Sequence, residues 1–97
     1  MIVAFSVTPI GTADASVADQ VAGAVRVVRE SGLPNRTDAM FTSIEGEWDE
    51  VMDVVKRAVD AVLSGSERVS LVLKADVRPG ATGQLDAKVR AIEERLA

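Results

Sequence analysis

The sequence predicts an α+β fold of the ferredoxin-like type: a four-stranded antiparallel sheet, helices on one face, and an extra C-terminal helix. Two observations lead to this prediction. Segments with the two-residue hydrophobic period of strands are interspersed with segments that have the 3.6-residue period of helices. Their order is β-α-β-β-α-β followed by one more helix, which is the split βαβ arrangement. We expect all 97 residues to form one domain, since domains commonly contain about 100–200 residues.

The first predicted strand covers residues 2–8. Side chains alternate between the two faces of a strand, so Val3, Phe5 and Val7 share one face. We expect the strand to end at Pro9, because proline has no N–H to donate to a neighbouring strand.

The first predicted helix covers residues 17–31. It carries an apolar stripe of valine and alanine at helical spacing, and Ser16 suits the N-cap position. Gly32 suits the position just after the last turn, and Pro34 cannot continue the helix.

Two short strands and a second helix follow. The strands cover residues 35–37 and 40–45, with a break around Asp38. Gly46 then marks a turn, and a stripe of valine and alanine predicts a helix over residues 47–63.

The last strand is predicted over residues 69–78, where apolar residues alternate with mostly polar ones up to Pro79. The last helix covers residues 84–96, and Asp86 and Arg90 stand four residues apart, so they can pair. Helices on one face leave the other face of the sheet open. We therefore expect a homodimer or homotetramer in which another copy covers that face.

The composition argues against several classes of function. There are 11 basic and 15 acidic residues, and a net charge of −4 disfavours a nucleic-acid partner. The chain has no cysteine and no histidine, which removes the thiolate nucleophile and the commonest general base and metal ligand. The acidic residues match no calcium loop. We therefore expect no catalytic residue, no metal and no enzymatic activity.

The sequence also predicts the location of the protein. The first residues lack the basic region and cleavage site of a signal peptide. No apolar run approaches the ~20 residues of a membrane-spanning helix. We expect a cytoplasmic protein with no membrane partner.

Motifs along nearly the whole chain resemble the small thiamine-binding proteins of the YkoF type. These motifs are Val7-Thr8-Pro9-Ile10-Gly11, Val25-Arg26-Val27-Val28-Arg29-Glu30-Ser31-Gly32-Leu33-Pro34, Met40 with Thr42, Ile44-Glu45-Gly46-Glu47-Trp48-Asp49-Glu50-Val51-Met52, and Lys74, Asp76, Arg78 and Gly80. The resemblance implies a ferredoxin-like fold assembled into dimers and dimers of dimers. It also implies binding of thiamine or its hydroxymethylpyrimidine portion, without established catalytic activity.

The chain departs from this pattern at Asn35, where relatives often carry an aromatic residue, and in the loop that follows. Relatives usually carry Gly-Pro-Met-Gly-Thr, whereas this chain has Asp38-Ala39-Met40-Phe41-Thr42. Phe41 in place of glycine adds bulk and removes backbone freedom beside the expected pocket.

A thiamine site needs a carboxylate, hydroxyl groups and an apolar or sulfur-bearing surface for the rings. Glu45 can supply the charge and accept a hydrogen bond from the exocyclic amine, Ser6 and Thr42 can supply hydroxyls, and Met40 can supply an adaptable wall. The other interpretation of Glu45 is an acidic residue that favours the N-terminus of the 47–63 helix.

Three further residues have two interpretations each. Lys74 and Asp76 either contact the ligand or belong to a solvated strand face or an interface row of ion pairs. Trp48 either stacks on a ring or anchors packing or an interface. The predicted ligand-binding set is therefore Ser6, Met40, Thr42, Glu45, Lys74 and Asp76.

The function predicted from the sequence is a non-catalytic carrier or sensor of thiamine or its pyrimidine portion, with no cofactor. One alternative is a structural or anion-sensing oligomer without a vitamin ligand. A second is a cofactor-independent enzyme, which the lack of proton-transfer groups disfavours.

Overall fold

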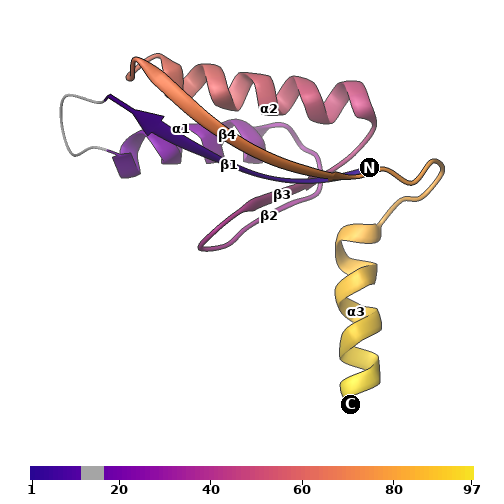
Figure 1. The fold of residues 1–97 in the computed structure, drawn as a ribbon. Helices are drawn as coiled ribbons and strands as arrows, with labels where there is room; N and C mark the ends of the chain where they lie inside the picture. Colours follow the sequence, from indigo (N-terminus) through magenta and orange to yellow (C-terminus); the bar gives the residue numbers. More distant parts are fainter. Residues whose placement is uncertain (12–16) are drawn as a thin grey trace.

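A computed structural model describes residues 1–11 and 17–97 as a four-stranded antiparallel sheet with three helices (Figure 1). The elements are β1 (Ile2–Ile10), α1 (Val17–Glu30), β2 (Asn35–Thr37), β3 (Thr42–Glu45), α2 (Trp48–Leu63), β4 (Arg68–Asp76) and α3 (Gln84–Leu96). The predicted fold class and element order are confirmed. The N-cap predicted at Ser16 lies outside the described residues.

The strands lie in the order β2-β3-β1-β4, and every neighbouring pair is antiparallel. The central strand β1 pairs with β4 along its whole length, from Ile2 opposite Asp76 to Ile10 opposite Arg68. On its other side β1 pairs with β3 only as far as Phe5 opposite Thr42. Among the described residues, the second half of β1 therefore has a strand neighbour on one side only.

The prediction that Pro9 ends the first strand is wrong. The strand continues to Ile10, and Pro9 is buried opposite Val69 of β4. Proline is tolerated in a strand where its missing N–H faces an unpaired edge. Pro9 meets this condition because β3 ends opposite Phe5, so in the described part of the chain one edge of β1 has no partner strand at Pro9.

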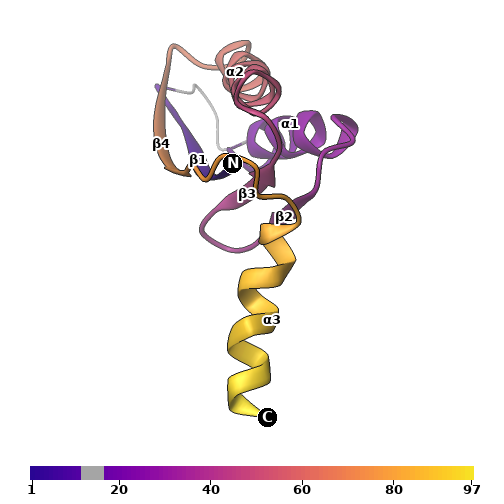
Figure 2. The ribbon, with the colours of Figure 1, turned by 90° about the vertical axis from the view of Figure 1, so that its right-hand side faces the viewer.

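Helices α1 and α2 cover one face of the sheet and enclose the core (Figure 2). The buried apolar residues are Val3, Phe5 and Ile44 from the sheet, Ala24 and Val28 from α1, and Val51, Val54, Val55, Ala58 and Val62 from α2. Valine and alanine make up most of this core, as expected for a chain with 3% aromatic residues. Each fully buried valine contributes on the order of 1.5–3 kcal/mol relative to an exposed one.

The junction between β3 and α2 is a tight turn at Gly46. A Cβ atom at this position would come within 3.2 Å of Val51 and 3.3 Å of Leu33, so any larger residue would require these two side chains to shift slightly. The backbone N–H of Glu47 donates to the Glu50 carboxylate at 3.2 Å, which satisfies a group at the start of α2.

Helix α3 projects away from the sheet on the side opposite to α1 and α2, and the C-terminus lies at its far end (Figures 1 and 2). No α3 side chain is buried within the described structure. The radius of gyration is 14.6 Å, compared with about 12.5 Å expected for a compact chain of this length. The projecting helix accounts for this excess.

Candidate functional site

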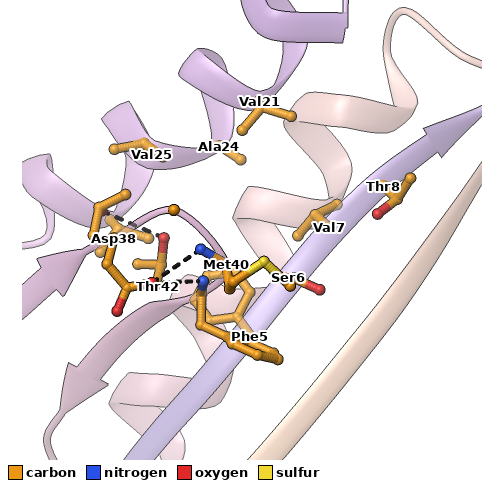
Figure 3. Close-up of a pocket in the computed structure, with 14 residues that line it drawn as sticks. Phe5, Ser6, Val7, Thr8, Val21, Ala24, Val25, Asp38, Met40 and Thr42 are labelled. Carbon is orange, nitrogen blue, oxygen red and sulfur yellow. Dashed lines mark hydrogen bonds between the residues drawn. The ribbon is translucent and has the colours of Figure 1, made fainter.

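A cavity of about 330 Å³ lies between β1, α1 and the β2–β3 loop (Figure 3). Its apolar walls come from strand β1, one side of helix α1 and the loop, and its polar residues come from β1, β2, β3 and the loop. The lining residues are Phe5, Ser6, Val7, Thr8, Val21, Ala24, Val25, Val28, Thr37, Asp38, Ala39, Met40, Phe41 and Thr42. We call this space the β1–α1 cavity. Its volume lies within the range of about 300–1,000 Å³ that is typical of small-molecule sites.

The cavity forms because β3 is too short to follow β1. The two strands separate after the Phe5–Thr42 pair, and residues 38–41 turn back toward β2. The backbone N–H of Asp38 donates to the carbonyl of Phe41 at 3.0 Å and closes this turn. Helix α1 spans the resulting gap with small or β-branched side chains, which leave the space unfilled.

The backbone N–H and C=O of Val7 lie on an edge of β1 that borders this cavity. Met1 and Gly46 exchange two hydrogen bonds, with N···O distances of 2.9 and 3.1 Å. In an antiparallel ladder every second residue directs both its N–H and its C=O to the same neighbouring strand. The backbone groups of Val3, Phe5 and Val7 therefore point toward the β3 side, as those of Met1 do. Among the described residues, Val7 has no strand partner on that side.

Asp38 keeps the Val7 edge free. If β3 continued in register, Met40 would lie opposite Val7. Instead the carboxylate Oδ1 of Asp38 accepts hydrogen bonds from the backbone N–H groups of Met40 and Phe41, both at 3.0 Å (Figure 3). The Met40 N–H is thus turned away from β1.

The carboxyl group of Asp38 is an acceptor held in its ionised form. The N–H of Phe41, and then that of Met40, lower the pKa of Asp38 below its usual value, because they donate to the charged oxygen. Among the described residues that line the cavity, Asp38 is the only one with a charged side chain. Sequence reasoning treated Asp38 only as a break between strands. A sequence signal was available, since aspartate in a turn often accepts hydrogen bonds from backbone N–H groups that follow it.

Four residues with hydroxyl groups line the cavity, Ser6, Thr8, Thr37 and Thr42, and the last two lie close to each other. Thr42 is only 8% exposed, and its Oγ1 lies 3.3 Å from the Oγ1 of Thr37, its partner across the β2–β3 ladder. The loop residues Met40 and Phe41 form part of the wall. Phe41 adds the expected bulk beside the pocket, yet the cavity is still open.

Glu45 lies outside the β1–α1 cavity. Its carboxylate accepts two backbone hydrogen bonds from the first turn of α3, Oε2 from Gln84 at 2.9 Å and Oε1 from Leu85 at 3.1 Å. The N-cap of α3 is Gly83 at φ 66°, which has no side chain to satisfy these groups. Glu45 is 5% exposed. The carboxylate thus caps α3, whereas the N-cap of α2, the helix that follows Glu45 in the sequence, is Glu47.

Asp76 and Lys74 lie on β4, on the face of the sheet opposite to the core. The Asp76 carboxylate forms an ion pair with Lys88 of α3, and the hydrogen bond from Lys88 lowers the pKa of Asp76. Lys74 stands opposite Ala4 in the β1–β4 ladder. Neither residue lines the β1–α1 cavity. Of the predicted set, the structure brings Ser6, Met40 and Thr42 together and places Glu45, Lys74 and Asp76 elsewhere.

Two other sequence expectations concern charged and aromatic residues near α3. Asp86 pairs with Arg36 of β2 at 3.0 Å and not with Arg90, because the first turn of α3 packs beside the β2–β3 hairpin. Trp48 is 56% exposed at the start of α2, so it contributes little to the core.

A second cavity, of about 260 Å³, lies beside Glu45 and the start of α3. Both oxygens of the Glu45 carboxylate are already occupied there. The β1–α1 cavity is therefore the stronger candidate. Among the described residues, no group of carboxylates is arranged to hold a metal ion. None of the described helices has the length and hydrophobicity of a membrane span.

Comparison with known proteins gives concordant results. The family model for thiamine-binding proteins matches residues 3–93. A UPF0045 protein of Mycobacterium bovis is 56% identical over 97 residues, which cover 99% of this chain and 94% of that protein.

Two solved structures are similar over most of their length. A domain of unknown function from Bacillus cereus shares 38% identity with a TM-score of 0.83, over 91% of this chain and 85% of that one. A hypothetical protein from Methanocaldococcus jannaschii shares 34% identity with a TM-score of 0.84, over 96% and 95% of the two chains.

Proposed function

The chain belongs to the thiamine-binding protein family, and we propose that it is a non-catalytic, cytoplasmic carrier or sensor that binds thiamine or its hydroxymethylpyrimidine portion. The observation that carries this proposal is the β1–α1 cavity, which has the size of a small-molecule site and gathers Ser6, Met40 and Thr42 in its lining. Family membership suggests the ligand, and the cavity suggests where it binds.

The lining of the cavity matches the chemistry of the proposed ligand. Valine and phenylalanine side chains offer apolar surface for an aromatic ring, and the Met40 thioether adds a polarizable contact. The hydroxyls of Thr37 and Thr42 can donate to or accept from ring nitrogens and amines. Binding then rests on ring burial and hydrogen bonds, with no covalent step.

The same lining supports a non-catalytic role. Proton transfer needs a titratable group with a pKa near the working pH. Asp38 is the only described lining residue with a charged side chain, and its pKa is lowered, further away from neutrality. No lysine or arginine is present among the described lining residues, which disfavours the alternative of an anion sensor at this cavity.

Calorimetric titration tests the proposal. The purified protein is titrated with thiamine and, separately, with hydroxymethylpyrimidine, and choline serves as a cation that lacks the pyrimidine ring. We expect saturable heat with at least one of the first two compounds and none with choline. Absence of heat and of a thermal shift with both at millimolar concentration would refute the function.

We also propose that the protein is a homodimer or a homotetramer. Two surfaces of the same chain are uncovered in the described structure. One is an apolar stripe on α3 formed by Leu85, Val89, Ile92 and Leu96, and the other is the mixed face of the sheet away from α1 and α2, where Val72 is 54% exposed among mostly polar neighbours. Helix α3 points away from its own sheet (Figure 2), so a second copy is the partner that can cover both surfaces reciprocally.

A further inference from the structure

We propose that the β1–α1 cavity selects intact, unphosphorylated thiamine, with the aminopyrimidine on the free backbone edge of Val7 and the thiazolium beside Asp38. This inference rests on the proposed function and goes further. The cavity would distinguish thiamine from its neutral pyrimidine portion and from its phosphate esters. Two features of the cavity, as its described residues form it, carry this inference: an unpaired strand edge and a single negative charge.

The first feature is the edge at Val7. The N–H and C=O of Val7 point the same way, toward the cavity, and have no strand partner among the described residues. The aminopyrimidine of thiamine carries a ring nitrogen acceptor next to an exocyclic amine donor. This pair is complementary to the N–H and C=O of Val7, so the ring can add to β1 as another strand would.

The second feature is the carboxylate of Asp38. Its Oδ1 is used by the N–H groups of Met40 and Phe41, whereas Oδ2 has no hydrogen-bond partner in the part of the chain that the structure describes. The two N–H groups fix the carboxylate at the cavity wall while one oxygen stays available. No described lining residue carries a positive charge that would neutralise it.

These features together define a ligand class. The Val7 edge accepts an aminopyrimidine whether or not a second ring is attached. Asp38 attracts the cationic thiazolium, gives no such attraction to neutral hydroxymethylpyrimidine, and repels a diphosphate group. The cavity should therefore bind thiamine more tightly than hydroxymethylpyrimidine, and thiamine diphosphate most weakly.

The test compares the wild-type protein with Asp38→Asn by titration with thiamine, hydroxymethylpyrimidine, thiamine diphosphate and oxythiamine. Asparagine keeps the oxygen that accepts from Met40 and Phe41 and removes only the charge. We expect Asp38→Asn to weaken thiamine binding by roughly twofold to fivefold, as for a charge pair at an exposed site, and to leave hydroxymethylpyrimidine unchanged. Asp49→Asn, which removes an exposed charge from the first turn of α2, is the matched control and should change neither.

Oxythiamine tests the Val7 edge without a mutation. Its oxo group replaces the exocyclic amine and reverses the donor and acceptor pattern, so the Val7 carbonyl would face another acceptor. We expect binding to the wild-type protein about tenfold or more weaker than that of thiamine, because a buried acceptor is left unpaired.

The outcomes separate this inference from the proposed function. If thiamine and hydroxymethylpyrimidine bind equally and Asp38→Asn weakens both, the function stands and the charge selection is wrong. If oxythiamine or thiamine diphosphate binds as tightly as thiamine, the orientation is wrong. If none of the four compounds binds, both the inference and the function are refuted.

Discussion

One side chain shapes the candidate site. Asp38 accepts the Met40 and Phe41 N–H groups, and in doing so it prevents β3 from continuing beside Val7. An unpaired strand edge usually invites further pairing, and natural proteins normally cover or blunt it. Here the edge opens into a cavity lined with apolar side chains, where a flat ring can occupy the place of a strand. The loop residue thus connects the local turn to the shape of the site.

At the residue scale, Thr42→Val should weaken thiamine binding by about twofold to tenfold, the effect of one lost neutral hydrogen bond. Valine has nearly the same shape and suits a strand, so the free energy of unfolding should fall by less than about 1 kcal/mol. Calorimetry and thermal unfolding measure the two effects separately. Thr82→Val, which removes an exposed hydroxyl before α3, is the control and should bind as the wild type does. Equal affinities for all three proteins would show that the Thr42 hydroxyl does not contact the ligand.

At the scale of the elements, helix α3 depends on a residue from another part of the chain. A glycine N-cap offers no side-chain acceptor, and Glu45 of β3 supplies both missing acceptors from across the fold. The carboxylate also lies where the helix dipole is positive. The ion pairs Arg36–Asp86 and Lys88–Asp76 hold the same turn to the sheet. These contacts explain how a helix with no buried side chain has a fixed start.

Glu45→Gln should therefore loosen α3 and leave the rest of the fold intact. Glutamine can accept a hydrogen bond from one of the two N–H groups but presents its amide NH₂, a donor, to the other, and the loss of such a cap costs about 1 kcal/mol. Hydrogen exchange should become faster in residues 84–96 and stay unchanged in β1 and α2. Glu94→Gln, an exposed position near the end of the same helix, should show no such change. If amide protection in α3 is the same in the wild type and in Glu45→Gln, the Glu45 carboxylate does not stabilise α3.

The helices and strands could be predicted from the sequence better than the candidate site could. Helix and strand positions were predictable because the valine stripes of α1 and α2 and the alternation in β4 are local patterns. Pro9 was misassigned because its tolerance depends on where β3 ends. The partner of Glu45 lies 39 residues away at Gln84, and only the fold brings them together. The role of Val7 likewise follows from strand register, which a single sequence does not reveal, whereas the turn at Asp38 has a local sequence signal.

At the scale of the whole molecule, α3 and the open face of the sheet are the surfaces that another copy can cover. Ile92 and Leu96 are 59% and 76% exposed on a helix about 20 Å long. An unpartnered apolar stripe of this kind marks an interaction surface. The β1–α1 cavity lies on the other side of the sheet, beside α1, so assembly through α3 does not block it.

Ile92→Glu should convert the oligomer into a monomer, because it places a charge in the centre of the apolar stripe. Light scattering after size-exclusion chromatography at micromolar concentration measures the mass. Arg90→Glu, which changes the charge on the polar side of α3, should keep the mass of the wild type. A wild-type protein that is already monomeric would overturn the proposed assembly without affecting the ligand proposal.

The most direct test of the central claim, that a thiamine-type ligand occupies the β1–α1 cavity, is a titration followed by amide chemical shifts in NMR. With thiamine added to uniformly ¹⁵N-labelled protein, the largest shifts should fall on Val7, Asp38, Met40 and Thr42, with small shifts in β4 and α3. Shifts concentrated instead at Glu45, Lys74 and Asp76 would place the ligand on the opposite face of the sheet and contradict the account.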